Sequence, residues 1–249
     1  MLRKSNLRDC SRLLVCVMGL LASTAACAAA SDNQLNAAER DAGWQLLFDG
    51  QSLAGWRTYR ATAPGQQWQV QDGALTLTGK GGGDLIYDQR YQNFELQLQW
   101  RISRAGNSGV FILADEELDY IFVKAPEVQL LDDARHPDNK VATHLSGSLY
   151  DLIASPDAAR RPAEEWNSLR IRYLDQRLRV WQNGVATADI VIGSQRWNDL
   201  VANSKFAQWP FATLSEGYIG LQDHGDPVAF KNIKLLPLKP ERATASGSK

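Results

Sequence analysis

The segment of this chain best equipped for chemistry is Glu127-Val128-Gln129-Leu130-Leu131-Asp132-Asp133. On a β-strand, Glu127 and Gln129 would point to one face and Val128 and Leu130 to the other, because side chains alternate along a strand. A carboxylate beside an amide, followed by two more carboxylates, could form the polar floor of a cleft. The same pattern would also fit a sheet face that contacts only solvent.

The chain has three histidines, at positions 136, 144 and 224. His224 follows an apolar run in the turn Gln222-Asp223-His224-Gly225. A neutral imidazole there could act as a general base near neutral pH, although an ordinary surface histidine would look the same. Asn107-Ser108-Gly109 precedes another apolar run and indicates either a turn or an amide placed over a sugar hydroxyl.

Four candidate metal ligands lie close together in the sequence, namely Asp132, Asp133, His136 and Asp138. They could bind a divalent cation, but their spacing differs from that of an EF-hand loop. No complete ligand set stands out, so no metal or cofactor is assigned from this pattern.

Several function classes are disfavoured by what the sequence lacks. It has no Gly-rich phosphate loop, no His-Glu-x-x-His helix and no Gly-x-Ser-x-Gly elbow. All three cysteines, Cys10, Cys16 and Cys27, lie in the first 30 residues, which excludes thiol catalysis from the rest of the chain. With 27 Lys+Arg against 28 Asp+Glu there is no basic excess, so a nucleic-acid partner is not expected.

Residues 1–30 have the layout of a secretory signal peptide: a basic start, an apolar run over residues 13–22 and small residues ending in Ala28-Ala29-Ala30. We therefore expect a periplasmic or secreted protein that begins at Ser31. Cys27 resembles the cysteine of a lipoprotein box, with Thr24 where leucine is usual. If Cys27 is lipidated, the protein would be an outer-membrane lipoprotein, and this is the only membrane attachment that we expect.

The remaining sequence predicts an all-β domain over residues 43–238, between a short leader or helix at 31–42 and a disordered tail at 239–249. Apolar and polar residues alternate strictly along 94–102, as in a half-buried strand. Asp72-Gly73 and Asn183-Gly184 are hairpin signals, and a further turn is expected at Asp175-Gln176. Helical segments are scarce, with one or two turns expected within 157–166. Many short strands separated by turns favour a jelly-roll sandwich of antiparallel sheets.

Taken together, an ordered set of motifs resembles the 3-keto-disaccharide hydrolase family, also described as a 3-keto-glucoside 1,2-lyase / 3-keto-2-hydroxy-glucal hydratase domain. The motifs are Gly43-Trp44-x-x-Leu47-Phe48-Asp49-Gly50, Leu53-x-Gly55-Trp56, Tyr91-x-Asn93-Phe94, Asn107-Ser108-Gly109-Val110-Phe111, Glu127-Val128-Gln129-Leu130-Leu131-Asp132, Glu165-Trp166-Asn167, Gly217-Tyr218-Ile219-Gly220-Leu221-Gln222-Asp223-His224-Gly225 and Phe230-Lys231-Asn232-Ile233. The resemblance implies a concanavalin A-like fold and an exported enzyme of sugar catabolism that acts on a small saccharide.

The chemistry implied by the resemblance is an elimination. A ketone at C3 acidifies the hydrogen on C2, a base removes it, and the enolate expels the C1 substituent; water can then add to the 2-hydroxy-glucal, giving net hydrolysis. We expect Glu127 or His224 to be the base, with the other assisting the leaving group or the water. Asn107, Gln129 and Gln222 would hold hydroxyls, Tyr150 could donate to the developing oxygen, and Asp132 could orient His224 or help bind a cation. A divalent cation on the enolate oxygen would also suit this chemistry.

Two departures from the family pattern bear on the substrate. Family members often carry an arginine where this chain has Leu113-Ala114-Asp115, and a Thr-Gly-Ala-x-Tyr motif where it has Leu145-Ser146-Gly147-Ser148-Leu149-Tyr150. The missing arginine keeps open a non-catalytic carbohydrate-binding module of the same fold. A retaining endoglucanase is a weaker alternative, because Asp115-Glu116-Glu117-x-Asp119 has its acidic residues in the wrong order.

Overall fold

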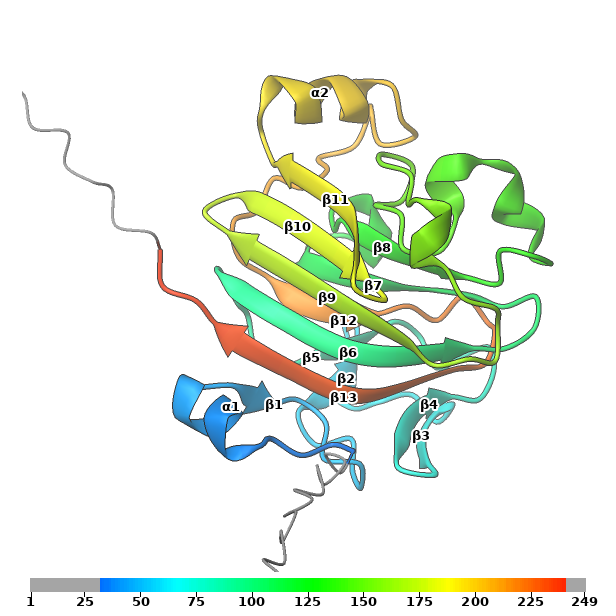
Figure 1. Ribbon diagram of the computed structural model, residues 1–249, viewed down its shortest axis with the longest axis vertical. Helices are drawn as coiled ribbons and strands as arrows, with labels where there is room; N and C mark the ends of the chain where they lie inside the picture. Colours follow the sequence, from blue (N-terminus) through cyan, green and yellow to red (C-terminus); the bar gives the residue numbers. More distant parts are fainter. Residues whose placement is uncertain (1–31, 241–249) are drawn as a thin grey trace, which may run out of the picture.

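The structure, a computed structural model, describes residues 32–240, and two antiparallel β-sheets stack face to face within them (Figure 1). The predicted signal peptide, Cys27 and most of the predicted tail lie outside the described residues. No helix within residues 32–240 is long and apolar enough to cross a membrane.

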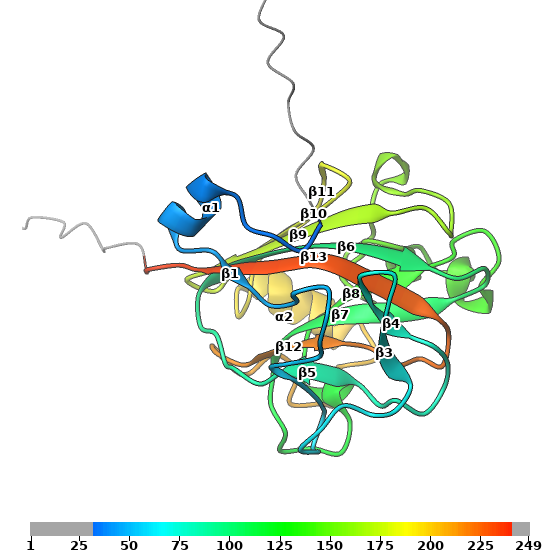
Figure 2. The same cartoon turned by 90° about the horizontal axis from the view of Figure 1, so that it is seen from below.

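The larger sheet has eight strands in the order β11-β10-β9-β6-β13-β4-β3, with β1 also paired to β13. Its strands are β1 (Gln45–Leu46), β3 (Trp68–Gln71), β4 (Ala74–Leu77), β6 (Phe94–Ile102), β9 (Asn167–Leu174), β10 (Arg177–Gln182), β11 (Val185–Val191) and β13 (Val228–Pro237). The smaller sheet has the order β2-β5-β12-β7-β8. Its strands are β2 (Trp56–Thr58), β5 (Leu85–Tyr87), β7 (Asn107–Ala114), β8 (Glu127–Leu131) and β12 (Tyr218–Leu221). Figure 2 shows the two layers edge-on, and the predicted all-β jelly-roll sandwich of antiparallel sheets is confirmed.

The predicted turns join neighbouring strands of the larger sheet. Asp72-Gly73 joins β3 to β4, Asp175-Gln176 joins β9 to β10, and Asn183-Gly184 joins β10 to β11. All six residues have positive φ, as two-residue hairpin turns of the I′ type require. The strand predicted at 94–102 is β6, with the same bounds.

The space between the sheets is filled by apolar side chains from both layers, including Leu96, Leu98 and Trp100 of β6 and Val128 and Leu130 of β8. The odd-numbered residues of β6 face away from this core. Glu95 on that outer side is nevertheless only 6% exposed, because Arg170 and Arg172 form ion pairs with it.

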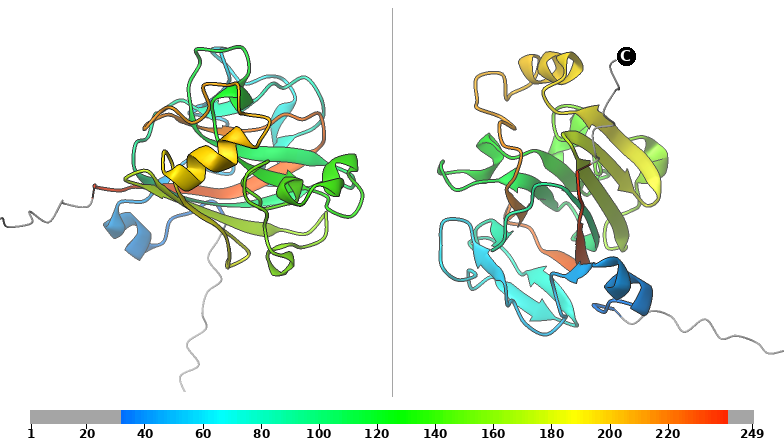
Figure 3. Two further views of the ribbon diagram at one scale, coloured as in Figure 1. Left: turned by 90° about the horizontal axis from the view of Figure 1, so that it is seen from above. Right: turned by 90° about the vertical axis from the view of Figure 1, so that its left-hand side faces the viewer.

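Within the part of the chain that the structure describes, helices are few and short (Figure 3). They comprise α1 (Ala37–Ala42), α2 (Gln195–Ala202) and four 3₁₀ turns, η1 (Ile121–Val123), η2 (Pro137–Lys140), η3 (Ala142–His144) and η4 (Asp157–Ala159). η4 is the single turn found within the segment where one or two turns were expected, whereas α2 was not predicted. The residues expected to form a leader contact the domain, since Asn33 exchanges hydrogen bonds with Asn232 at 2.6 and 2.8 Å.

Candidate active site

A polar cavity of about 380 Å³ lies on the face of the smaller sheet that is turned away from the core. Its floor comes from β7 and β8 and from the residues that follow β12, and its walls come from loops. The lining residues are Asp84, Asn107, Tyr120, Phe122, Glu127, Gln129, Asp138, Tyr150, Lys205, Gln222, Asp223 and His224. Six of the seven residues expected to form the site are therefore in one cavity, Asp132 being the exception.

Strand alternation places Glu127 and Gln129 on this floor. Val128 and Leu130 of the same strand enter the core, while Glu127 and Gln129 line the cavity. The expectation that β8 presents these two pairs to opposite faces is therefore confirmed.

Gly109 of β7 makes room for the Glu127 carboxylate. β7 and β8 are paired so that Gly109 lies opposite Gln129 and Phe111 lies opposite Glu127. A Cβ atom on residue 109 would lie 2.1 Å from Glu127 Oε1, far inside van der Waals contact. The Asn-Ser-Gly motif therefore has glycine at position 109 because the Glu127 side chain occupies the space that a Cβ atom would need.

Glu127 is 6% exposed, and burial raises the pKa of its carboxyl well above the ordinary value. The neighbouring carboxylates of Asp84 and Asp138 raise this pKa further, while Lys205 and a hydrogen bond from the Gln222 side chain oppose the shift. A carboxyl with this environment can accept or give up a proton near neutral pH, which is the property that general acid–base catalysis requires.

Lys205 forms part of the cavity wall and was not predicted from the sequence. Its Nζ lies 4.1 Å from the centre of the Tyr150 ring and 5.2 Å from that of Phe206. Burial lowers the pKa of the ammonium group, opposed by the charges of Glu127, Asp151 and Asp138. The Lys205 backbone N–H donates to Asp151 Oδ2 at 2.8 Å, which fixes the segment after α2 against the wall. No motif marks this lysine, because the chain fold alone brings it to Glu127.

Asp84 is a second carboxyl in the cavity that sequence reasoning missed. Burial and the nearby Asp223 carboxylate raise its pKa to about 6, partly offset by a hydrogen bond from the Asp223 backbone N–H. Asp223 itself accepts from the backbone N–H groups of Gly81, Gly83 and Gly225. It therefore ties the loop before β5 to the loop after β12, at the ends of two neighbouring strands.

The three amide side chains of the floor carry unused hydrogen-bonding atoms. Among the described residues, buried polar atoms without a partner include Asn107 Oδ1, Gln222 Oε1 and both Oε1 and Nε2 of Gln129. A buried polar atom left unpaired costs about 1–3 kcal/mol. Their concentration in one cavity indicates a site made for a ligand with several hydroxyl groups.

Tyr150 is held by a polar cluster in the wall. Its hydroxyl donates to Asp138 Oδ2 at 3.1 Å, and its ring stacks on His144 with centres 4.4 Å apart. Burial raises the pKa of this phenol. The hydroxyl proton is therefore directed at Asp138, and the ring supports Lys205.

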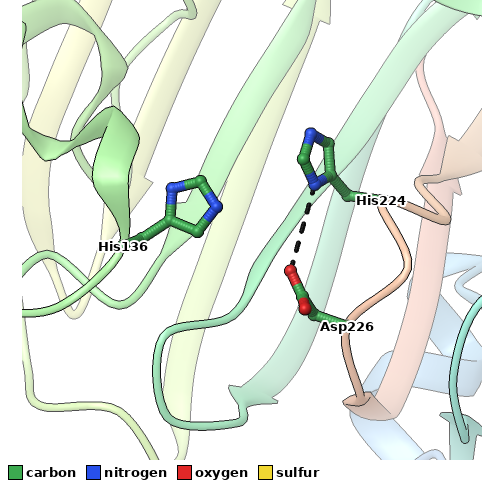
Figure 4. Close-up of side chains that lie close together, drawn as sticks. All are labelled: His136, His224 and Asp226. Atoms are coloured by element: carbon green, nitrogen blue, oxygen red, sulfur yellow. Dashed lines mark ion pairs between the residues drawn. The ribbon is translucent and has the colours of Figure 1, made fainter.

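The carboxylates of Asp132 and Asp133 accept hydrogen bonds from the backbone of the surrounding loops. Asp132 is 1% exposed and accepts from the backbone N–H groups of Ala105 and Ala134 at 2.7 and 3.1 Å. Asp133 accepts from the backbone N–H of Ser146 at 2.8 Å. The structure does not bring these two carboxylates, His136 and Asp138 together around one point. His136 instead faces His224 across the rim of the cavity (Figure 4).

The acidic segment behind the endoglucanase alternative lies outside this cavity. Asp115 and Glu117 form ion pairs with Lys124, and Glu116 pairs with Arg57. These carboxylates are used in holding loops together.

A larger cavity, of about 510 Å³, lies between α1 and the outer face of the eight-stranded sheet. Its carboxylate, Glu39, is paired with Lys234, and this contact lowers the pKa of Glu39. A carboxylate that is fully ionised and neutralised is poorly suited to proton transfer, so we assign the chemistry to the smaller cavity.

The fold and the site together define a β-sandwich protein with a polar pocket of the size that a small saccharide needs. Residues 43–236 match the 3-keto-alpha-glucoside-1,2-lyase-like domain family, and the chain belongs to this family. It is 35% identical over 244 residues to a 3-keto-disaccharide hydrolase of Bacteroides thetaiotaomicron, covering 82% of this chain and 84% of that protein.

Two solved structures from Parabacteroides distasonis, each of a proposed glycosyl hydrolase, are also similar. The first has a TM-score of 0.79 at 29% identity and covers 84% of this chain and 100% of its own. The second has a TM-score of 0.60 at 27% identity, with 78% and 99% covered. The resemblance to the 3-keto-disaccharide hydrolase family inferred from the motifs is confirmed.

Proposed function

We propose that this protein cleaves 3-keto-glycosides, a 3-keto-disaccharide among them, by elimination across C1 and C2, followed by addition of water. The observation that carries the proposal is the Glu127 carboxyl, buried with a raised pKa beside Lys205 and among amide atoms that lack partners. The named activity of the Bacteroides thetaiotaomicron relative supports the same substrate class.

In the proposed reaction Glu127 takes the proton from C2, and the C–H electron pair forms an enolate with the C3 carbonyl. The enolate then expels the C1 oxygen with its bonding pair, leaving a C1=C2 double bond, and the departing oxygen is protonated. Water adds its hydroxyl to C1 and a proton to C2, which gives 3-keto-glucose. Only one base is needed at C2, unlike the two opposed carboxylates of ordinary glycosidases.

The other residues of the cavity have supporting roles in this proposal. The ammonium of Lys205 would stabilise negative charge that develops on the enolate oxygen. Asn107, Gln129 and Gln222 would hold the sugar hydroxyls with their unpaired amide atoms. We favour Glu127 over His224 as the base, because His224 lies at the rim with 49% of its side chain exposed.

The test is turnover of a 3-keto-glucoside in D₂O, followed by mass spectrometry. Elimination and hydration place one solvent deuteron on C2 of the product, whereas direct hydrolysis at C1 leaves C2–H intact. The substrate without protein controls for spontaneous exchange, and Glu127→Gln should lower the rate by about 10²-fold or more. Release of 3-keto-glucose without deuterium on C2 would refute the elimination, and saccharide binding without turnover would favour the carbohydrate-binding module instead.

Export of the protein through residues 1–30 is part of the same proposal, because a periplasmic or secreted enzyme would meet saccharides outside the cytoplasm. Its support is the three-part pattern of this segment. Labelling of cells with a fatty-acid analogue would distinguish lipidated Cys27 from cleavage before Ser31.

A further inference from the structure

Two histidines and one aspartate meet at the rim of the candidate active site. His136 precedes and caps η2, whereas His224 and Asp226 lie in the loop between β12 and β13. One side-chain nitrogen or oxygen from each residue lies within 4.8 Å of those of the other two. Figure 4 shows the three side chains converging from two sides of a gap.

The ligand atoms of these three side chains lie slightly farther apart than the ligands of a bound transition metal do. His224 Nδ1 lies 3.9 Å from Asp226 Oδ2, and the two imidazole centres are 5.9 Å apart. Bonds of about 2.0–2.2 Å place the ligands of a transition metal roughly 3–3.5 Å from one another. The three ligand atoms would therefore have to approach by about 1 Å, which side-chain rotation at a partly exposed rim can supply.

Neighbouring backbone groups orient two of the three side chains. The Asn107 N–H donates to Asp226 Oδ2 at 3.0 Å and leaves the carboxylate with further lone pairs. His136 Nδ1 accepts the Asp138 N–H at 3.1 Å. Ligation through the other ring nitrogen would move the ring proton to Nδ1 and break this hydrogen bond, which is much weaker than a bond from imidazole to a transition metal.

We propose that His136, His224 and Asp226 bind one divalent transition metal of the zinc, cobalt, nickel or manganese class. Imidazole nitrogen suits these ions, whereas calcium and magnesium prefer oxygen ligands only. Three protein ligands leave further coordination positions open. Because His224 also lines the cavity, an open position could receive an oxygen of a bound saccharide, and this last role rests on the proposed function.

This metal site would give different roles to Glu127 and His224, the two candidate bases. A histidine that ligates a metal has no free lone pair on the ligating nitrogen, so His224 would hold the ion and Glu127 would move the proton. Of the four candidate metal ligands that the sequence places between residues 132 and 138, only His136 belongs to this site.

The test is a titration of the untagged, EDTA-treated full chain with Co²⁺, followed by visible absorption and calorimetry in the absence of sugar. We expect saturable binding of one Co²⁺ per chain, with ligand-field bands that disappear when Zn²⁺ is added. His136→Ala, His224→Ala and Asp226→Asn should each weaken binding by more than about 100-fold, because loss of a second-shell partner alone costs 10- to 100-fold.

His144→Ala is the matched control, since it removes the histidine that lies outside the trio and should leave the affinity unchanged. Circular dichroism checks that each variant is folded, and Asp226→Asn keeps the acceptor for the Asn107 N–H. Absence of stoichiometric binding, or variants at the three ligand positions that bind Co²⁺ as tightly as the unaltered protein, would overturn the proposal. Since no saccharide is present, either result leaves the proposed elimination to be judged separately.

Discussion

The substitution Gly109→Ala tests whether the position of Glu127 controls turnover. The added Cβ would lie 2.1 Å from Glu127 Oε1, 2.7 Å from Cδ and 2.8 Å from Cγ. Ordinary contact begins near 3.4 Å, so the carboxylate oxygen must withdraw by about 1.3 Å. A displacement of about 1 Å in a reacting group can cost about 10²-fold in rate. We therefore expect kcat for a 3-keto-glucoside to fall by about 10²-fold.

The fold should tolerate this change better than the reaction does. Residue 109 does not have positive φ, and the Glu127 side chain can move aside, so we expect a stability loss within about 1–3 kcal/mol, as for a modestly overpacked site. The assay is kcat and KM from release of the aglycone, with thermal unfolding measured on the same samples.

Gly79→Ala is the matched control, because a Cβ there meets no atom within 4 Å and its φ is not positive. It should behave like the unaltered protein in both assays. If Gly109→Ala also turns over substrate at the unaltered rate, the placement of Glu127 over Gly109 is irrelevant to the chemistry and the assignment of the base fails.

Three further predictions follow from the same contacts. Glu127→Gln should become more stable relative to the unaltered protein as pH rises above the ordinary carboxyl pKa. In that pH range the Glu127 carboxyl ionises in the unfolded chain, whereas in the folded protein its raised pKa keeps it protonated, so the unaltered protein loses stability. Melting temperatures from pH 4 to 9 measure this, and a difference independent of pH would contradict it. Lys205→Met should lower kcat by about 10²-fold with a smaller change in KM, if the ammonium acts on the transition state; an effect on KM alone would make it a binding residue. Asp132→Ala, which removes the acceptor for two backbone N–H groups, should cost about 1–3 kcal/mol of stability and leave kcat/KM near normal. A loss of substrate affinity without a loss of stability would instead support the predicted role of Asp132 in substrate binding.

Much of the fold follows from local patterns. Strict alternation over 94–102 predicted β6, and the three turns between hairpin strands were found where two-residue turn signals stand. α2 was missed because its signals are weak: Ser194 caps it by accepting from the Trp197 N–H, but Trp197 is its one buried residue. Leu200 and Val201 also pack against the core at helical spacing from Trp197, but an eight-residue segment is too short for this pattern to indicate a helix by itself.

The residues of the candidate site likewise fall into those that the sequence predicted and those that only the structure revealed. Glu127, Gln129 and Asn107 lie on strands, so alternation and motif together indicated that they belong to one cavity. Lys205 and Asp84 come from loops, and the pairing of distant segments brings them there. Asp132 has the residue type of a ligand-binding group, but its carboxylate is consumed by two backbone donors, which no sequence pattern could show.

The floor and the walls of the cavity are built from different kinds of chain. Glu127 and two of its amide neighbours stand on paired strands, whereas Lys205 and Asp138 stand on segments outside the two sheets. Loops accept substitutions and insertions more readily than paired strands do. Under the proposed function, exchange of wall segments could therefore change the leaving group that is accepted without disturbing the paired strands that hold Glu127.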